Sequence, residues 1–590
     1  MNRRTLMSIS RRRFLKQAGF AAAALPAFSL SGLAGCAQRG TGSRPNILLI
    51  LADDLGYSDL GCYGGEIETP NLDELAGNGL RFTQMYNSAR CCPTRASLLT
   101  GLYPHQTGIG NFVRNRPDAP HGYRGFLQPN TVTVAEVLKE AGYRTFMTGK
   151  WHVNDPVPTE QGFEEFYGFV KGYATNSWDP TQMIRLPEGR PQPKYEKGEF
   201  FSQDAVTDHA IDFIQQAREE TPDQPYFAYV AYRGPHFPVQ APEKYVEKYK
   251  ETYTKGWDKL RESRLTRMKE IGLLEEDVRL SPRSSIPIPR VAREHGVPGD
   301  LEHNPAWDEI PADRQADLAR RMAVYAGMVD NLDHNVGRMV EDLKANGEIE
   351  NTLILFLSDN GSCAEWGPYG FDLNENLMTS SQPGVGVRGG TPGLPSEVHT
   401  GEALEQMGGP EGDGFAYGSG WANVSNTPLS EYKQYTHEGG IATPMIAHWP
   451  SVIKEEGAFR RQTGHVFDVT ATCIDVARAT YPYYYDGHDI TPLEGISLLP
   501  VFRGETLPHR SFVFAHFGNV ALLDWPWKLV AEDALADQGL KEETEWELYN
   551  LEEDRPEINN LVSKHPDRVE VMKKRYTDEA WRIGIFPQAT

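Results

Sequence analysis

The sequence has little cysteine and a marked deficit of positive charge. Only 6 of its 590 residues are cysteine, which is too few for a disulfide framework in a chain of this length. Its 59 lysines and arginines face 81 aspartates and glutamates, which gives a net charge of -22 at pH 7. Because such a chain repels nucleic acid and anionic lipid, we expect no nucleic-acid partner. An anionic ligand would therefore need a local cationic pocket.

Long apolar runs are missing beyond the N-terminal segment, and the insertions of the chain contain no repeat or low-complexity tract. We therefore expect no membrane-spanning helix in the main part of the chain. Hydrophobic residues make up 39% and charged residues 24%, which is typical of an ordinary globular protein. A chain of 590 residues predicts a large domain with a smaller appended one.

The N-terminal segment has the features of an export signal. Paired arginines within Ser10–Lys16 precede an apolar stretch over 19–33, and the pattern resembles a twin-arginine signal. It ends in a Leu-Ala-Gly-Cys tetrapeptide that resembles a bacterial lipobox, in which Cys36 would be lipidated. A membrane helix is the alternative, but Pro26 and the short run disfavour it. We expect export by the twin-arginine machinery to the periplasm or cell envelope, with contact to membrane only through an N-terminal lipid anchor.

Short apolar runs alternate with helical patterns along the chain. The runs predict buried strands at Asn46–Leu51, Arg144–Thr148, Tyr226–Tyr232 and Thr352–Leu357. Helical periodicity predicts helices at Val132–Ala141 and Ala312–Ala345. This alternation favours an α/β fold in which helices cover a sheet.

Polar side chains follow each of the four predicted strands. They are Asp53 and Asp54, Lys150 and His152, His236, and Asp359 and Asn360. In open α/β sheets, functional groups collect where the strands end. Carboxylate and amide oxygens favour calcium or magnesium over zinc. Taken singly, an Asp-Asp pair is more often a helix cap and an Asp-Asn-Gly segment a turn, so neither pair alone identifies a metal site.

Two insertions and a tail complete the predicted organisation. The insertion at 241–311 is rich in charged and aromatic residues and is expected to be helical over 243–273. The insertion at 363–426 is rich in glycine and is expected to form surface loops around a pocket. The tail from about residue 511 predicts short strands and a last helix, Pro566–Arg582. The chain is thus divided into a signal at 1–36, a tether at 37–44, a main domain at 45–464 and a C-terminal part at 465–590.

The most informative segment is Cys91-Cys92-Pro93-Thr94-Arg95. A lone cysteine beside a turn proline is usually structural, but the whole string resembles the signature of the type I sulfatases: Cys, any residue, Pro, Ser or Thr, then Arg. In that family a maturation enzyme oxidises the first cysteine to formylglycine, so the resemblance implies this modification at Cys91. A thiol would be trapped as a stable sulfated adduct, whereas hydrated formylglycine can release sulfate by re-forming the aldehyde.

Further segments resemble the same family from residue 46 onward. They are Gly149-Lys150-Trp151-His152, Gly234-Pro235-His236-Phe237-Pro238, the stretch from Ser425 through Lys433 to Pro444, and Glu547–Leu551. The stretches 256–272 and 420–423 resemble the larger bacterial arylsulfatases. Without this frame Lys433 would be taken for a surface lysine, and His437 is interpreted as structural.

The resemblance implies which residues hold the metal and the sulfate. It places one calcium ion, rather than magnesium, among Asp53, Asp54, Cys91, Asp359 and Asn360. Together with the metal, the sulfate oxygens would contact the side chains of Arg95, Lys150 and Lys433, which stabilise charge on the transferring group.

The resemblance also implies the acid and base groups. Asp359 would help to deprotonate the nucleophile, and His236 would protonate the departing ester oxygen. His152 would take the proton of the second hydroxyl, while Arg95 orients residue 91.

The fold implied by the resemblance is an alkaline phosphatase-like α/β/α sandwich with a large mixed sheet, followed by a smaller C-terminal domain with a four-stranded antiparallel sheet and a helix. The main domain would be catalytic, and its substrates would be small-molecule or carbohydrate sulfate esters. The implied partner is a formylglycine-generating enzyme, which would act before the folded chain is exported.

Two other functions stay open on the sequence. One is a phosphonate or phosphate ester hydrolase of the same superfamily, which can share the cysteine motif. A two-zinc phosphatase is disfavoured because the candidate ligands are Asp and Asn rather than additional His. The other is a non-catalytic lipoprotein that binds sulfated glycans, which gains little support because every expected polar position is filled.

Overall fold

The computed structural model describes residues 44–170, 176–196, 198–284, 304–365, 367–372, 396–410 and 414–587. The predicted signal, with Cys36, and nearly all of the tether lie outside the described residues. Residues 44–590 form one unit, and the predicted division near residue 464 stays a prediction. Across the described ranges, no helix has both the length and the apolar character needed to cross a membrane.

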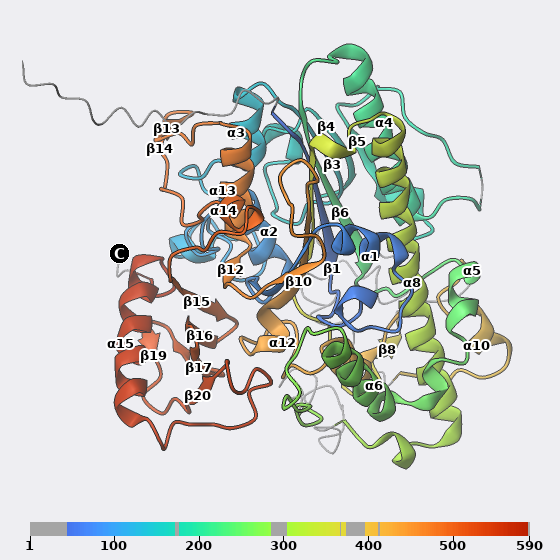
Figure 1. The fold of residues 1–590 in the computed structure, drawn as a ribbon, viewed down its shortest axis with the longest axis vertical. Helices are drawn as coiled ribbons and strands as arrows, with labels where there is room; N and C mark the ends of the chain where they lie inside the picture. Colours follow the sequence, from blue (N-terminus) through green and yellow to red (C-terminus); the bar gives the residue numbers. More distant parts are fainter. Residues whose placement is uncertain are drawn as a thin grey trace, which may run out of the picture. The chain divides into compact units, whose positions relative to one another are not determined.

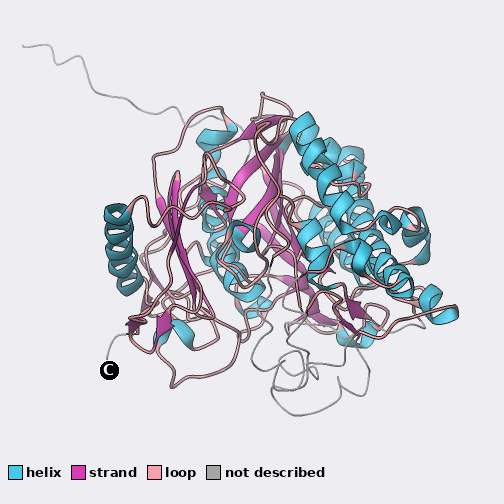
Figure 2. Ribbon diagram, turned by 90° about the horizontal axis from the view of Figure 1, so that it is seen from below, coloured by secondary structure: helices cyan, strands magenta, loops and turns pink. Residues whose placement is uncertain are grey.

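A mixed sheet of ten strands runs through the centre of this unit (Figures 1 and 2). The four strands predicted from the sequence are adjacent and parallel: β3 (Arg144–Lys150), β6 (Tyr226–Pro235), β1 (Asn46–Asp53) and β7 (Thr352–Ser358). The others are β2 (Leu80–Tyr86), β4 (Glu165–Phe169), β5 (Ile184–Leu186), β10 (Ala442–His448), β11 (Ala458–Arg460) and β12 (Gly464–His465). The order is β11-β2-β10-β7-β1-β6-β3-β4-β5, with β12 beside β2, and β10 is antiparallel to both neighbours.

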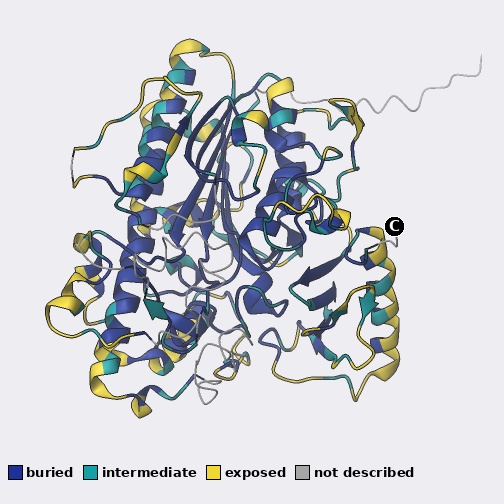
Figure 3. Cartoon of the chain, turned by 180° about the vertical axis from the view of Figure 1, so that it is seen from behind, coloured by how far each residue is buried: buried dark blue, intermediate teal, exposed yellow. Residues whose placement is uncertain are grey.

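Helices cover both faces of the sheet, which explains why the central strands are continuous apolar runs. On β1, Leu48 and Ile50 lie in one hydrophobic cluster and Leu49 and Leu51 in another, because successive side chains point to opposite faces. The first cluster includes α1 (Pro70–Gly77), α4 (Ser202–Glu220) and α8 (Ala312–Ala345). The second includes α2 (Cys91–Thr100), α3 (Val134–Glu140) and α13 (Phe467–Val476). Figure 3 shows the buried sheet between helices whose outer faces are exposed.

The smaller elements lie in the connections. The helices are α5 (Glu243–Val246), α6 (Trp257–Glu270), α10 (Glu402–Gln406), α11 (Gly418–Ser425), α12 (Glu438–Ile441) and α14 (Leu499–Phe502). The short strands pair as β8 (Phe371–Asp372) with β9 (Phe415–Ala416), β13 (Tyr484–Tyr485) with β14 (His488–Asp489), and β18 (Leu535–Ala536) with β19 (Gly539–Leu540).

The C-terminal part contains a four-stranded antiparallel sheet and a helix, as the resemblance implied. Its strands are β15 (Ser511–His516), β16 (Asn519–Asp524), β17 (Trp527–Ala531) and β20 (Glu547–Asn550), in that order. The helix α15 (Pro566–Arg582) contacts β15, β16 and β17. A buried ion pair ties this sheet to the main part of the chain, because Lys528 Nζ lies 3.0 Å from Glu438 Oε1.

The strand and long-helix predictions are confirmed, and one prediction for the insertions is wrong. Residues 243–273 are largely helical, as expected, but Gly256, with a φ of 82°, separates α6 from the short helices before it. The expected surface loops of 363–426 include α11, every residue of which is buried. Helix α11 is buried because Trp421 packs 5.7 Å from Trp257 and 5.5 Å from Trp307, measured between ring centroids.

Candidate functional site

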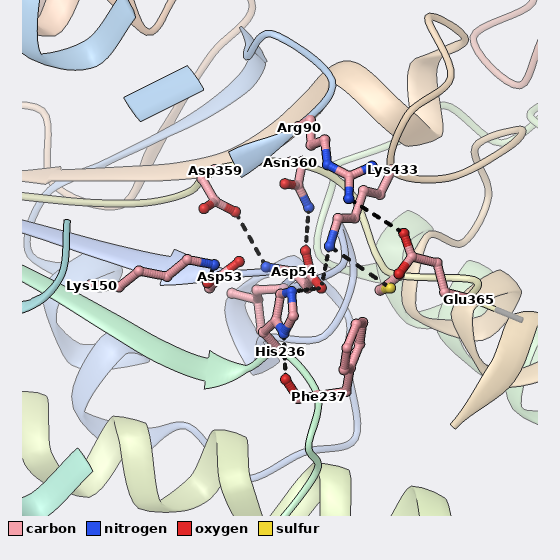
Figure 4. A network of polar contacts seen from close by, with 12 residues as sticks. Asp53, Asp54, Arg90, Lys150, His236, Phe237, Asp359, Asn360, Glu365 and Lys433 are labelled. Atoms are coloured by element: carbon pink, nitrogen blue, oxygen red, sulfur yellow. Dashed lines mark hydrogen bonds and ion pairs between the residues drawn. The ribbon is translucent and has the colours of Figure 1, made fainter. Parts of the chain in front are cut away.

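The polar residues that follow the four parallel strands meet at one edge of the sheet (Figure 4). Lys150 Nζ lies 2.5 Å from Asp53 Oδ2, and the backbone N–H of Asp54 donates to Asp359 Oδ1 at 3.3 Å. His236 Nε2 lies 3.5 Å from Asp54 Oδ2. Because β3, β6, β1 and β7 are adjacent and parallel, their carboxyl ends adjoin. The structure thus brings together residues that are far apart in the sequence.

Cys91 begins helix α2, beside this group of side chains. Its Sγ lies within 4.8 Å of carboxylate oxygens of Asp53 and Asp359. Burial opposes ionisation of the thiol, but the hydrogen bond with Cys92 and the charge of Lys150 lower the pKa of Cys91 well below its usual value. The N-terminus of a helix also favours a negative charge. Position 91 is therefore suited to a group that becomes anionic.

Three cations neutralise three buried carboxylates at this edge of the sheet. The pairs are Arg95 with Asp359, Lys433 with Asp54 and Lys150 with Asp53. Their N···O distances are 2.7, 2.9 and 2.5 Å in that order, and the six residues are at most 4% exposed. Buried charges are stable only when they are paired. The charge balance is therefore a requirement of the fold as well as of any chemistry.

Two side-chain oxygens at this edge of the sheet have no hydrogen-bond partner among the described residues and could bind a cation. Asp53 Oδ1 and Asn360 Oδ1 are buried and have no hydrogen-bond partner within the described part of the chain, although Asn360 Nδ2 donates to Asp54 Oδ1 at 2.7 Å. Burial raises the pKa of Asp54 to about 6, and burial together with Asp53 raises the pKa of Asp359 well above its usual range. A hard cation would use the unpartnered oxygens and stabilise the ionised carboxylates. The donor set therefore fits calcium or magnesium.

Two histidines flank the group. His152 lies in a cluster with Cys91 and Cys92 in which the potential ligand atoms are within 4.8 Å of one another. Burial lowers the pKa of His152 to about 4, so its ring is neutral and can accept a proton. His236 Nδ1 donates to the carbonyl oxygen of Phe237 at 2.5 Å, which fixes the ring and leaves Nε2 directed at the carboxylates. Burial, with nearby lysines, lowers the pKa of His236 well below its usual value.

The backbone at the strand ends adopts conformations that are rare for ordinary residues. Asp54 and His152 have φ angles of 65° and 55°, and such strain concentrates at functional sites. Gly149 has a φ of 96°, and a Cβ there would lie 1.9 Å from the carbonyl oxygen of Ala231 on β6. Only glycine fits this close approach, which places Lys150 at its contact with the carboxylates.

The structure adds two charged residues that the sequence analysis did not select. Arg90 Nη2 lies 3.8 Å from Glu365 Oε1, and Figure 4 shows both residues beside Lys433. Arg90 could have been found because it directly precedes the cysteine motif. Glu365 carries no such signal, since it lies in a glycine-rich insertion whose path the sequence does not define.

The C-terminal sheet also reaches the site. The turn between β15 and β16 places the ring of Phe517 5.3 Å from the Arg90 guanidinium carbon, while Phe112 lies 5.1 Å away from it. His437, interpreted from the sequence as structural, lies with its Nε2 2.8 Å from Glu547 Oε2 and joins α12 to β20. Cys36 lies outside the described residues.

Comparison with known proteins finds similar proteins over most of the length of the chain. The sequence matches the family model described as Sulfatase over residues 45–479. It is 31% identical to an arylsulfatase of Klebsiella aerogenes over 480 residues, which cover 79% of this chain and 94% of that protein. It is 31% identical to a sulfatase of Schizosaccharomyces pombe over 554 residues, 90% of this chain and 92% of that protein. The crystal structure of Ps i-CgsB in complex with k-i-k-neocarrahexaose has a TM-score of 0.59 at 23% identity, covering 91% of this chain and 93% of that one.

Proposed function

This chain belongs to the sulfatase family and hydrolyses sulfate esters, and we propose that residue 91, as formylglycine, supplies its nucleophile. The observation that carries the proposal is the position of Cys91, which begins a buried helix beside paired carboxylates and cations. Hydrated formylglycine would supply two hydroxyl groups on one carbon, one to attack sulfur and one to lose a proton as sulfate departs. The corresponding partner is a formylglycine-generating enzyme.

We propose that one calcium ion is held by oxygens of Asp53, Asp54, Asp359 and Asn360 and by residue 91. The unpartnered oxygens of Asp53 and Asn360 support this ligand set. Three cations and three carboxylates already balance, so a divalent ion leaves the site with two excess positive charges. This excess attracts an anionic ester although the whole chain carries a net charge of -22. When bound, the ion would supply a Lewis acid that polarises a sulfate oxygen.

The sulfate oxygens would contact Arg95, Lys150 and Lys433. Each lysine uses part of its ammonium group to bind a carboxylate, at 2.5 Å for Lys150 and 2.9 Å for Lys433. An ammonium group has three N–H donors, so each lysine keeps donors for a sulfate oxygen. Fixed donors of this kind stabilise charge that develops in the transition state without reorganisation.

Proton transfers would use the two histidines and Asp359. His236 is fixed by its Nδ1–H bond to the Phe237 carbonyl, so Nε2 is the atom that would carry a proton to the departing ester oxygen. Burial and the nearby lysines lower the pKa of the free ring and keep it neutral, so this role requires Nε2 to take up a proton when the anionic ester binds beside it. His152 is neutral and close to residue 91, where it would accept a hydroxyl proton. The Asp359 carboxylate, held by Arg95, would accept the proton released when the nucleophile attacks.

We further propose that the chain is exported by the twin-arginine machinery and anchored by lipid at Cys36. The support is the sequence of residues 10–36. Labelling of the expressed chain with a palmitate analogue tests the anchor: Cys36→Ser should abolish labelling and release the protein from the membrane fraction. Labelling that survives this substitution would contradict the proposal.

The direct test of the function is sulfate release from 4-nitrophenyl sulfate by protein produced with a formylglycine-generating enzyme. We expect release that chelation with EDTA lowers and added calcium restores, with slower cleavage of the matching phosphate and phosphonate esters. Cys91→Ala should reduce release to background, whereas Cys62→Ser, at a cysteine whose backbone bonds to Asp73 and Arg81 rather than to residues of the site, should not. Faster cleavage of the phosphonate ester would favour the alternative hydrolase, and matured protein that cleaves neither ester would favour a binding protein.

A further inference from the structure

Arg90 and Glu365 form a charged pair that none of the proposed catalytic steps uses. We infer that this pair binds a hydroxyl group in the alcohol part of the ester, and that this alcohol is a carbohydrate. The inference rests on the proposed function, because it concerns the organic part of an ester whose sulfate lies among Arg95, Lys150 and Lys433.

The pair lies next to the residues that would hold the sulfate. Arg90 directly precedes Cys91 and is the N-cap residue of α2. Glu365 follows Cys363 by two positions, and Cys363 Sγ lies 3.9 Å from Lys433 Nζ. Figure 4 shows Arg90, Glu365 and Lys433 side by side. The alcohol part of an ester bound at Lys433 would therefore lie within reach of the pair.

The pair is not a closed structural salt bridge. Its N···O distance of 3.8 Å exceeds hydrogen-bond length. Arg90 Nε and Glu365 Oε2 are buried and have no hydrogen-bond partner among the residues that the structure describes. The two residues are only 7% and 6% exposed, and buried charged groups without hydrogen bonds are costly. The pair thus offers one unused donor and one unused acceptor.

Glu365 is held in place through its other carboxylate oxygen, Oε1. Glu365 Oε1 accepts from Gln434 Nε2. The backbone N–H of Gln434 donates to the carbonyl of Ala89 at 2.7 Å, and its carbonyl accepts from Asn519 Nδ2 at 2.9 Å. Glu365 is therefore fixed through one carboxylate oxygen while the other stays free. Such preorganisation is expected of a binding group and lowers the cost of ordering it when a ligand arrives.

The chemistry of the pair and its neighbours favours a carbohydrate. A hydroxyl group both donates and accepts, so one hydroxyl can donate to Glu365 Oε2 and accept from Arg90 Nε. The rings of Phe112 and Phe517 flank the guanidinium, and Phe112 also lies 5.6 Å from the ring of His152. Apolar walls with a few fixed polar groups are typical of ligand sites. A sugar ring offers both C–H faces and hydroxyls, whereas a plain aryl ring leaves the two charged atoms unpaired.

The test compares two kinds of substrate in matched variants. Matured wild-type protein is assayed for sulfate release from 4-nitrophenyl sulfate and from glucose, galactose and N-acetylglucosamine sulfated at each available hydroxyl. Glu365→Gln keeps the shape of the side chain and removes its charge, and Glu402→Gln in exposed α10 is the control. Arg90→Met is the second variant, with conversion of Cys91 measured by peptide mass because Arg90 adjoins the motif.

We expect at least one sugar sulfate to be hydrolysed by the wild type. On that substrate, Glu365→Gln and Arg90→Met should lower kcat/KM roughly 10- to 100-fold more than they do on 4-nitrophenyl sulfate, while Glu402→Gln changes neither value. An equal effect of Glu365→Gln on both substrates, or a wild type that hydrolyses the aryl ester and none of the sugar sulfates, would overturn the inference and leave the proposed function intact. Matured wild type that releases sulfate from no substrate would instead refute the proposed function.

Discussion

Arg95→Met removes the cation that joins three parts of the site, and its effect can be worked out from the contacts. Arg95 Nε and Nη2 donate to Asp359 Oδ2 at 3.0 and 2.7 Å, and Nη1 donates to the carbonyl of Lys150 at 2.7 Å. Arg95 Nη2 also lies 3.4 Å from Asp53 Oδ2. Methionine fills a similar volume but makes none of these hydrogen bonds.

The substitution leaves three buried carboxylates facing two cations. Removing one partner of a buried ion pair typically costs roughly 3–5 kcal/mol, because the remaining charge is uncompensated. We therefore expect the free energy of unfolding of the metal-free variant to fall by about that amount. A bound calcium ion adds positive charge at the same carboxylates, so calcium should recover part of the loss. Sulfate release should still fall about 100-fold or more, since the guanidinium also stabilises charge in the transition state.

The assay is urea unfolding followed by tryptophan fluorescence, in EDTA and in excess calcium, for wild type, Arg95→Met and a control. Arg575→Met is the matched control, because Arg575 pairs with Asp524 at 2.8 Å but its side chain is 45% exposed. Exposed pairs contribute little, so the control should lose about 1 kcal/mol or less. Arg95→Met that unfolds like the wild type in EDTA would refute the charge-balance reasoning. If calcium does not reduce the difference in free energy of unfolding between Arg95→Met and the wild type, the assignment of the cation to these carboxylates is refuted.

Three further predictions concern the fold around the site. Burial lowers the pKa of His437, but the hydrogen bond with Glu547 raises it, and the net value is about 9. Because this value exceeds the unfolded value of about 6.5, protonated His437 stabilises the folded state by at most about 3 kcal/mol. This stabilisation is fully present below about pH 6.5 and is lost as the pH rises through about 9. Unfolding of His437→Gln should therefore depend less on pH over this window than unfolding of the wild type, and equal pH dependence would contradict the assignment. Gly149→Ala should lose roughly 3 kcal/mol of stability from the contact with β6, whereas Gly77→Ala, which meets no atom within 4 Å, should be neutral or stabilising in thermal unfolding. Lys528→Met should cost roughly 3–5 kcal/mol, because it leaves the buried Glu557 unpaired, while Glu438 keeps its pair with Arg555; a loss as small as that of Arg575→Met would show that Glu557 is not ionised.

Much of the fold could be predicted from local patterns. Strands buried on both faces give continuous apolar runs, which is why β1 and β7 were predicted within two residues of their observed ends. The bounds of α8 and α15 match the prediction, because long helices show several turns of apolar periodicity. The polar residues after the strands were found for the same reason, since parallel neighbours bring their ends together.

The rest depends on contacts between distant loops. Arg90, Glu365 and Phe517 meet although they come from the cysteine motif, an insertion and the turn of the C-terminal sheet. No local pattern encodes such a meeting, because it is decided by how the connections cross the end of the sheet. Helix α11 was missed for a related reason: its burial comes from tryptophans of two other segments rather than from its own periodicity.

The most direct test of the central claim is the peptide mass at residue 91 measured on the same samples as the rate of sulfate release. Protein is produced with graded amounts of a formylglycine-generating enzyme, so that the fraction of converted Cys91 varies. The account predicts a rate per molecule that is proportional to this fraction and extrapolates to zero for unconverted protein. A rate that is independent of conversion, or sulfate release by protein that carries only cysteine at position 91, would contradict it.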